Sequence, residues 1–358
     1  MRYDHIVIGA GVIGSAAAYH LKRSSPDSRV LLIDMNGRAG AGNTSRSAAL
    51  YRNIFSSRAS RDLSTSSIRY YLELGFKVQM NPIGYLWMFS GDQWERSREA
   101  VSKLDPSADE LEFVDRETIG RMLKINTSGS DRFPPVKRGI LGHLCGSMSG
   151  MELAQHYTAE FESIGGEMGY DTEIIRIEMK GAGDRFAPWS DAGIETIADR
   201  EGKEYSADSY VFCTGAWTHR LLSGIGIYSG VLPKKRQLFG IKLDDPYQAA
   251  GDIDLDRVPA MILPAGGTYI KPMLHKKLML LGLADDLGQP YDMDDPNPDP
   301  EFFGRGLEPV LNHYFPDLKD YELKLKWAGY YSYHWPDKNP VVENVSNIYW
   351  ASGTSGPQ

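Results

Sequence analysis

The chain has 358 residues, of which 42% are hydrophobic and 24% are charged, and its formal net charge is −8 at pH 7. These proportions are ordinary for a globular protein, so they exclude a disordered or fibrous chain. The negative charge argues against a nucleic-acid partner, because that kind of binding depends on clustered Lys and Arg side chains.

The remaining signals of composition favour a reducing, cytoplasmic setting. Cys145 and Cys213 stand far apart in apolar surroundings, so they predict neither a disulfide framework nor a metal site. No apolar stretch has the length of a membrane span, and no transmembrane segment is expected. The one tight basic run, Lys234–Arg236, is interpreted as a solvated strand edge.

The first 34 residues predict a strand, a glycine turn, a helix and a second strand. Gly9, Gly11 and Gly14 have the GxGxxG spacing of a dinucleotide-binding loop. Gly9 allows the tight turn, Gly11 the close approach of a pyrophosphate, and Gly14 the close packing of helix on strand. The helix begins near Val12 and Ile13, and its free N–H groups and positive dipole end face the phosphates.

The second strand ends at Asp34, twenty residues after the last glycine of the loop. Its carboxylate can accept hydrogen bonds from a ribose diol and would repel the 2′-phosphate of NADP. Residues 38–53 are rich in Gly, Ser, Thr and Asn, and can present N–H groups and hydroxyls to phosphates and a flavin ring, although a polar surface loop has the same composition. The first motif alone therefore predicts NAD or FAD without separating them.

Periodicity predicts the elements that follow. Residues 82–91 predict a strand, and residues 110–123 predict a strand and a helix that Asp115 caps. The stretch 150–167 predicts a helix that Gly165 and Gly166 end, and it leads into the strand of Ile174 as a βαβ-like return to the first domain.

The second half of the chain predicts a different kind of sheet. Residues 209–213 predict a strand that ends in a small-residue turn, where backbone can approach a cofactor. Residues 231–286 alternate short apolar runs with Gly and Pro turns, as in an antiparallel sheet. Residues 302–315 predict a helix.

Four blocks of sequence together resemble the FAD-dependent amine and amino-acid oxidoreductase superfamily, which includes D-amino-acid oxidase, glycine oxidase and the sarcosine oxidase β subunit and dimethylglycine dehydrogenase branch. AGNTSRSAALYR at 41–52 is similar to the flavin-contacting segment of sarcosine oxidase β subunits. VFCTGAW at 211–217 is similar to the superfamily's strand that ends in Thr-Gly-x-Trp. The blocks at 327–342 and 347–356 resemble its late strands and closing glycine turn.

The resemblance implies an α/β fold with two discontinuous domains and an active site in the cleft between them. A Rossmann-type FAD-binding domain is expected at 1–80, 140–230 and 326–358, and a mainly antiparallel substrate sheet with flanking helices at 81–139 and 231–325. The cofactor is expected to be FAD. Besides the glycine loop and Asp34, its expected contacts are Met35, Asn43, Thr44, Ser45, Arg46, Ser47, Ile174, Cys213, Thr214, Gly215, Trp217, Gly353, Thr354 and Gly356.

The role of Ile174 has an alternative, and the residues at Arg46 and Tyr330 bear on how FAD is attached. Ile174 is explained equally well as a residue of a core strand. Some relatives attach FAD through a histidine or a cysteine, but Arg46 and Tyr330 or a neighbour occupy those places here. Neither side chain can form the link, so non-covalent FAD is expected.

The resemblance also suggests catalytic residues. Arg52 holds the place of an arginine that binds the substrate carboxylate, although a surface ion pair is an alternative. Tyr331 and Tyr333 share one face of a predicted strand and are expected to line the pocket, with core packing as the alternative. Lys271 is the nearest candidate for a lysine that assists oxygen activation in some oxidases, although a solvent-exposed lysine explains it as well.

The expected reaction is oxidation of the C–N bond of a small amino acid or N-methyl amino acid. The electron acceptor would be O2, an acceptor protein or a quinone, and a homo- or hetero-oligomer is expected. A 2-hydroxy-acid dehydrogenase and a flavin-binding subunit of a larger complex are the alternatives. Because relatives continue after the closing glycine turn, an incomplete chain is expected at Gln358.

Overall fold

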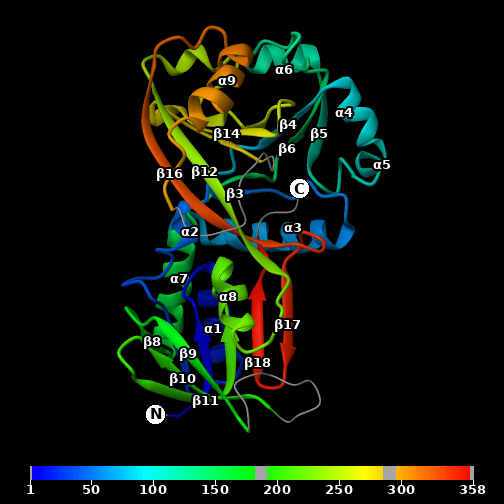
Figure 1. Ribbon diagram of the computed structural model, residues 1–358. Helices are drawn as coiled ribbons and strands as arrows, with labels where there is room; N and C mark the ends of the chain where they lie inside the picture. Colours follow the sequence, from blue (N-terminus) through cyan, green and yellow to red (C-terminus); the bar gives the residue numbers. More distant parts are fainter. Residues whose placement is uncertain (1, 182–191, 285–295, 355–358) are drawn as a thin grey trace.

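The computed structural model describes residues 2–181, 192–284 and 296–354 and contains two large sheets, one above the other in Figure 1. The first sheet has the strand order β17-β18-β11-β1-β2-β8. β1 pairs in parallel with β2 and β11, and the edge strand β17 is antiparallel to β18. The bounds are β1 Arg2–Ile8, β2 Val30–Ile33, β8 Glu167–Gly169, β11 Glu204–Phe212, β17 Val341–Val345 and β18 Ile348–Ser352.

Both faces of this sheet are covered, as a parallel sheet requires. Val7 and Leu32 pack against the helices α1 and α7 on one face. Because side chains alternate along a strand, Ile6 and Leu31 point the other way and pack against the antiparallel pair β9 and β10 and the helix α8. The bounds are α1 Val12–Ser24, α7 Gly150–Ser163, α8 Thr218–Ser223, β9 Ile174–Met179 and β10 Ile194–Asp199.

The second sheet has the order β16-β12-β15-β14-β13-β4-β6-β5 and is antiparallel except between β13 and β4. The long strands β12 and β16 pair along their length and descend toward the first sheet (Figure 1). The strand bounds are β4 Tyr85–Phe89, β5 Leu111–Asp115, β6 Arg138–Gly142, β12 Val231–Leu243, β13 Ala260–Ile262, β14 Thr268–Met273, β15 Leu278–Leu283 and β16 Tyr321–His334. The helices around it are α4 Gly91–Arg96, α5 Arg98–Val101, α6 Arg116–Met122 and α9 Glu308–Tyr314.

Short elements join the two sheets. The helix α2 packs against β16, where the Asn43 side-chain oxygen accepts a hydrogen bond from the N–H of Tyr330 (2.9 Å). On the same strand, the Trp327 indole N–H donates to the carbonyl oxygen of Arg46 (2.8 Å). The remaining bounds are α2 Asn43–Arg46, α3 Arg58–Leu74, β3 Leu50–Tyr51 and β7 Gly146–Ser147.

The strand after α7 differs from the expectation. The chain leaves α7 into β8, which continues the parallel sheet beside β2. Ile174 instead begins β9, which pairs antiparallel with β10 in the layer that covers the sheet. The βαβ-like return therefore ends at β8, and the strand of Ile174 belongs to a separate antiparallel pair.

The strands β12 and β16 bear on two further expectations, the domain boundary at residue 326 and the solvated basic run. The domain boundary proposed at residue 326 falls inside β16, whose whole length pairs with β12 of the second sheet. The basic run Lys234–Arg236 is not a solvated edge, since β12 lies between β16 and β15 and the three side chains are 2–7% exposed. At these three residues β12 pairs with β16, whereas its pairing with β15 begins at Leu238, so the burial does not come from strand pairing on both sides.

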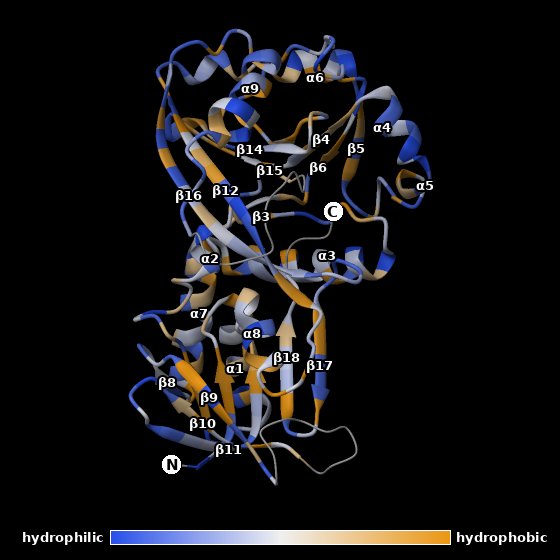
Figure 2. Cartoon of the chain, in the orientation of Figure 1, coloured by the Kyte–Doolittle hydropathy of each residue, from blue (hydrophilic) through white to orange (hydrophobic). Residues whose placement is uncertain are grey.

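Hydropathy follows the architecture. The central strands of the first sheet are strongly hydrophobic, whereas α4 on the outside is largely hydrophilic (Figure 2). Ile6, Val7 and Leu32 in these strands are fully buried. In the described part of the chain, no helix combines the length and the apolar character that crossing a bilayer requires.

Candidate functional site

A cavity of about 900 Å³ lies where the carboxyl ends of the first sheet's strands face the second sheet. In doubly wound sheets, ligands bind outside these strand ends at the point where the strand order reverses. Here β1, with β2 on one side and β11 on the other, is that point. The lining comes from the glycine loop, the end of β2, the segment around α2, β9, the turn after β11, and β12, β14 and β16.

The glycine loop has the geometry that its spacing predicts. Gly9 has a φ of +103°, and a Cβ there would lie 2.6 Å from the carbonyl oxygen of Cys213 at the end of β11. A Cβ at Gly14 would lie 1.8 Å from the carbonyl oxygen of Gly9, so a glycine is needed for α1 to approach β1 this closely. Gly9 and Gly11 line the cavity, whereas Gly14 acts behind it through packing.

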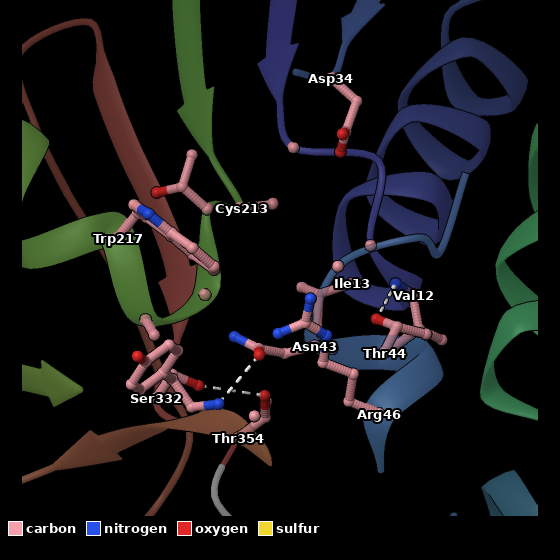
Figure 3. A pocket seen from close by; sticks show the side chains of 18 of the residues that line it. Val12, Ile13, Asp34, Asn43, Thr44, Arg46, Cys213, Trp217, Ser332 and Thr354 are labelled. Carbon is pink, nitrogen blue, oxygen red and sulfur yellow. Dashed lines mark hydrogen bonds between the residues drawn. The ribbon is translucent and has the colours of Figure 1, made fainter. Parts of the chain in front are cut away.

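The N-terminus of α1 is suited to an anion. Its N-cap residue, Gly11, has no side chain, and its first turn holds no acidic residue. The Val12 N–H donates to the Thr44 hydroxyl at 3.2 Å, which ties the segment of α2 to this helix end (Figure 3). Asp34 lies at the end of β2, where one carboxylate oxygen accepts a hydrogen bond from the Ala10 N–H (2.6 Å).

Most of the residues expected at the cofactor come together in this one cavity (Figure 3). They come from elements far apart in the sequence, and each borders the same space. The structure does not test their contacts with a cofactor, which stay predictions. Those that line the cavity are Gly9, Gly11, Val12, Ile13, Asp34, Met35, Asn43, Thr44, Arg46, Ser47, Ile174, Cys213, Thr214, Gly215, Trp217 and Thr354.

Besides Gly14, two expected cofactor residues do not border the cavity, and a third lies outside the described residues. The Ser45 hydroxyl donates to the carbonyl oxygen of Ala41 (3.2 Å), because it lies within the turn of α2. Gly353 has a φ of +76°, and a Cβ there would lie 2.8 Å from the carbonyl oxygen of Asn339, so its role is in a tight turn. Gly356 lies outside the described residues.

Of the two tyrosines expected to line the pocket, the structure places one at the cavity and one away from it. Tyr331 lines the cavity, but Tyr333 does not; its side chain is buried, with the Lys338 ammonium 5.9 Å from the ring centroid. Tyr330 and Ser332 line the cavity in its place. Successive residues of β16 border the cavity where the strand crosses it, so simple alternation of faces does not select the lining.

Arg52 lies among aromatic rings at the end of the cavity nearest the second sheet. Its guanidinium carbon is 5.0 Å from the ring centroid of Trp87 and 5.2 Å from that of Phe55. Burial raises the pKa of Tyr85, and the neighbouring Arg52, as a charge and a hydrogen-bond partner, opposes part of that rise. Arg52 is not part of the lining itself, and its contact with a substrate stays a prediction.

Arg236 is a lining residue that the sequence did not single out as functional. It is 7% exposed, and its guanidinium carbon is 5.3 Å from the ring centroid of Tyr331. Burial raises the pKa of Tyr331, and the charges of Arg236 and Arg52 oppose that rise. Tyr269 of β14 also lines the cavity and has its pKa raised by burial. A basic run inside an otherwise apolar strand was the signal that could have identified Arg236.

Lys271 is partly buried and is not the solvent-exposed lysine that was the alternative. Its ammonium donates to the carbonyl oxygen of Ala48 (2.8 Å), a lining residue. Burial, with a smaller effect of the Lys276 charge, lowers the pKa of Lys271 to about 8. Lys271 itself does not border the cavity.

Comparison with known proteins agrees with this geometry. Residues 4–358 match the family described as DAO, FAD dependent oxidoreductase. The chain belongs to this family. Within it, FAD-dependent oxidoreductase domain-containing protein 1 of Xenopus laevis is 22% identical over 99% of this chain and 76% of that protein. L-2-hydroxyglutarate dehydrogenase of Escherichia coli strain K12 is 22% identical over 64% of this chain and 51% of that protein.

Solved structures of DAO-type oxidoreductases share the fold. L-Proline dehydrogenase from P. horikoshii aligns with a TM-score of 0.80 at 20% identity, covering 99% of this chain and 88% of that one. Glycine oxidase from Geobacillus kaustophilus aligns with a TM-score of 0.76 at 18% identity, covering 98% of this chain and 89% of that one. The expected α/β fold, with a Rossmann-type sheet and a mainly antiparallel sheet, is thereby confirmed.

The cofactor of this DAO-family oxidoreductase is FAD, and the described residues fit it. The glycine cradle and the N-terminus of α1 would hold the pyrophosphate, and Asp34 would hold the adenosine ribose. The volume of the cavity lies in the range of about 300–1,000 Å³ that is usual for ligand pockets. Side chains of both sheets border it.

Proposed function

We propose that this FAD-dependent oxidoreductase oxidises the C–N bond of a small amino acid or N-methyl amino acid. FAD, when bound, supplies the acceptor for a hydride, which carries the two electrons of the oxidation. The substrate loses that hydride and one proton to become an imine, which water hydrolyses to a carbonyl compound and an amine. The protein's part is to bind the carboxylate and hold the reacting carbon in place.

The observation that carries this proposal is the character of the cavity near the second sheet. Arg236, Tyr269 and Tyr331 line it, and a guanidinium can pair with a carboxylate through two parallel hydrogen bonds. Among the described residues, the carboxylates in the lining are Asp34 and Glu173, both in the first domain. The reacting end is therefore suited to an anionic substrate.

Oxidation of a 2-hydroxy acid is the second candidate. It is supported by the similarity to L-2-hydroxyglutarate dehydrogenase of Escherichia coli. A 2-hydroxy acid presents the same carboxylate beside the reacting carbon, so the cavity suits both substrates. The two differ in the bond that is oxidised, C–N or C–O, and only the first releases an amine.

Anaerobic reduction of the purified holoprotein tests the proposal. A panel of glycine, sarcosine, D- and L-amino acids and 2-hydroxy acids is mixed with the protein, and loss of flavin absorbance is followed. Bleaching by amino acids with stoichiometric release of ammonia, methylamine or formaldehyde supports C–N oxidation. Bleaching by hydroxy acids alone would favour the second candidate, and no bleaching by either class would favour a flavin-binding subunit of a larger complex.

The proposal includes non-covalent FAD and an electron acceptor that is O2, a protein or a quinone. Arg46 and Tyr330 both border the cavity, and neither can form the link that a histidine or a cysteine makes in some relatives. Acid precipitation should therefore leave the yellow flavin in the supernatant.

Release of H2O2 during turnover identifies O2 as the acceptor, and turnover only with a quinone or dye identifies a dehydrogenase. Light scattering of the same preparation gives the oligomeric state.

A further inference from the structure

A smaller pocket of about 250 Å³ adjoins the cofactor cavity and shares part of its lining. Its border includes Asn36, just after Asp34 at the end of β2. It also includes Gly42, just before Thr44, whose hydroxyl accepts a hydrogen bond from the Val12 N–H at the start of α1. The pocket therefore lies beside the stretch between the ribose carboxylate and the N-terminus of α1, where the diphosphate of FAD would lie.

Two arginines border both the cavity and this smaller pocket. Arg46 is the last residue of α2, and Arg220 lies in α8, which follows the turn after β11. Both residues are exposed. Figure 3 shows Arg46 and Trp217, the residue before α8, on two sides of the space. Two cations from elements far apart in the sequence thus border the same place.

Neither guanidinium pairs with a carboxylate within residues 2–181, 192–284 and 296–354. Arg46 donates to the carbonyl oxygen of Ala328 at 3.3 Å, and the Arg220 side chain forms no hydrogen bond or ion pair in these ranges. By contrast, Arg176, another lining arginine of the first domain, pairs with the Glu178 carboxylate at 2.8 Å. The charges of Arg46 and Arg220 are therefore available for an anion.

The glycine loop supplies less positive charge than a diphosphate carries in negative charge. The loop and the first turn of α1, residues 9–15, contain no Lys or Arg. The helix dipole is equivalent to about half an elementary charge at this end, and the Val12 N–H already donates to Thr44. FAD has one negative charge on each phosphate. A guanidinium suits such a group, because it can form two parallel hydrogen bonds with phosphate oxygens.

We propose that Arg46 and Arg220 form an arginine clamp that binds the diphosphate of FAD from α2 and α8, in addition to the N-terminus of α1. Arg220 is a further cofactor-binding residue in this proposal. The clamp concerns the binding of FAD itself, so it does not depend on whether the enzyme oxidises a C–N or a C–O bond. Because both arginines are exposed, salt should screen their contribution.

Equilibrium dissociation of FAD from the holoprotein tests the clamp. The holoprotein is diluted in a series, and free FAD in the ultrafiltrate gives the Kd. Arg220→Gln should raise this Kd about tenfold, which corresponds to the loss of one charged hydrogen bond. Arg46→Gln should also raise it.

Salt dependence separates lost charge from lost packing. The Kd is measured between about 0.01 M and about 1 M NaCl, over which the screening length falls from about 30 Å to about 3 Å. The Kd of the wild type should rise with salt. It should rise less steeply in Arg220→Gln, because one exposed ionic contact with FAD is gone.

Two further variants serve as matched controls. Arg220→Lys keeps the charge without the guanidinium fork, so its Kd should lie between those of the wild type and Arg220→Gln. Arg23→Gln removes an exposed charge from the last turn of α1 and should leave the Kd within twofold of the wild type. The Tm in saturating FAD should be the same for Arg220→Gln and the wild type, since the exposed Arg220 side chain binds no described residue.

An FAD Kd within twofold of the wild type in Arg220→Gln would overturn the clamp. A tenfold rise with an unchanged salt dependence would overturn it as well, because the lost contact would then not be ionic. The measurement contains no substrate, so its result is separate from the outcome of the substrate panel.

Discussion

The ammonium group of Lys271 donates a hydrogen bond to the carbonyl oxygen of Ala48 at 2.8 Å, which joins β14 of the second sheet to the segment that lines the cofactor cavity. Burial lowers the pKa of this lysine from 10.5 to about 8. The side chain is therefore charged below about pH 8 and neutral above it. If O2 is the acceptor, reoxidation of the reduced holoprotein should slow as the pH rises through this value, because the nearby positive charge is lost.

Stopped-flow mixing of the reduced protein with O2 at a series of pH values measures this dependence. Lys271→Met should be about tenfold or more slower near pH 7 and show no step near pH 8. Lys276→Gln removes the like charge that contributes to the lowered pKa, so its step should move to higher pH. A step that persists in Lys271→Met would assign the titration to another group.

Gly14 permits the close approach of α1 to β1, and its replacement should damage both stability and cofactor retention. A Cβ there would lie 1.8 Å from the carbonyl oxygen of Gly9, so Gly14→Ala must push the helix away. Overpacking of this kind costs about 1–3 kcal/mol, and the displaced helix end should retain less FAD after desalting. Thermal unfolding and the ratio of flavin to protein absorbance measure the two effects.

Gly91→Ala is the control for this substitution. Gly91 is the first residue of α4, and a Cβ there meets nothing within 4 Å. The Tm and FAD content of the Gly91→Ala protein should equal those of the wild type or slightly exceed them. Normal FAD retention by Gly14→Ala would mean that the close packing of α1 on β1 is not needed to form the cofactor site.

The glycine loop could be predicted because its spacing acts locally. The Gly14 requirement comes from the carbonyl oxygen of Gly9, five residues earlier, and the order of strand, turn, helix and acid is readable over the first 34 residues. The resemblance added Thr44 and Thr214, whose segments meet the loop only in the folded chain. No local pattern could have placed them there.

Long-range pairing explains what the sequence did not reveal. Arg236 is buried where β12 pairs with the later strand β16 and where Ala284, the residue after β15, also contacts its guanidinium. A basic run alone cannot distinguish that position from an edge. Ile174 was expected in a continuous βαβ path, but its strand pairs with β10 instead, and Tyr333 is placed outside the cavity by the path of β16 across it. Individual strands and helices could be predicted from local sequence, whereas the strands that pair with them in the sheets could not.

The two cysteines should be unreactive in the native protein. Burial raises the pKa of Cys145 to about 11 and that of Cys213 to about 12, so the reactive thiolate is scarce near neutral pH. A chromogenic disulfide reagent should modify neither thiol in the holoprotein and both in guanidinium chloride. Rapid modification of the holoprotein would contradict this burial.

Arg52 is predicted to bind the substrate carboxylate beside the reacting carbon, and a conservative substitution tests that role. Arg52→Lys keeps the charge but loses both the planar stacking on Trp87 and the fork that pairs with a carboxylate. The Kd of butyrate should rise about tenfold or more, with a parallel rise in the KM of an amino-acid substrate. Arg58→Gln is the control, because that exposed arginine pairs with Asp62 on α3 away from the cavity. If Arg52→Lys retained FAD and bound butyrate as the wild type does, the carboxylate would have to be held elsewhere, and Arg236 would be the remaining guanidinium of the described residues near Tyr331 able to hold it.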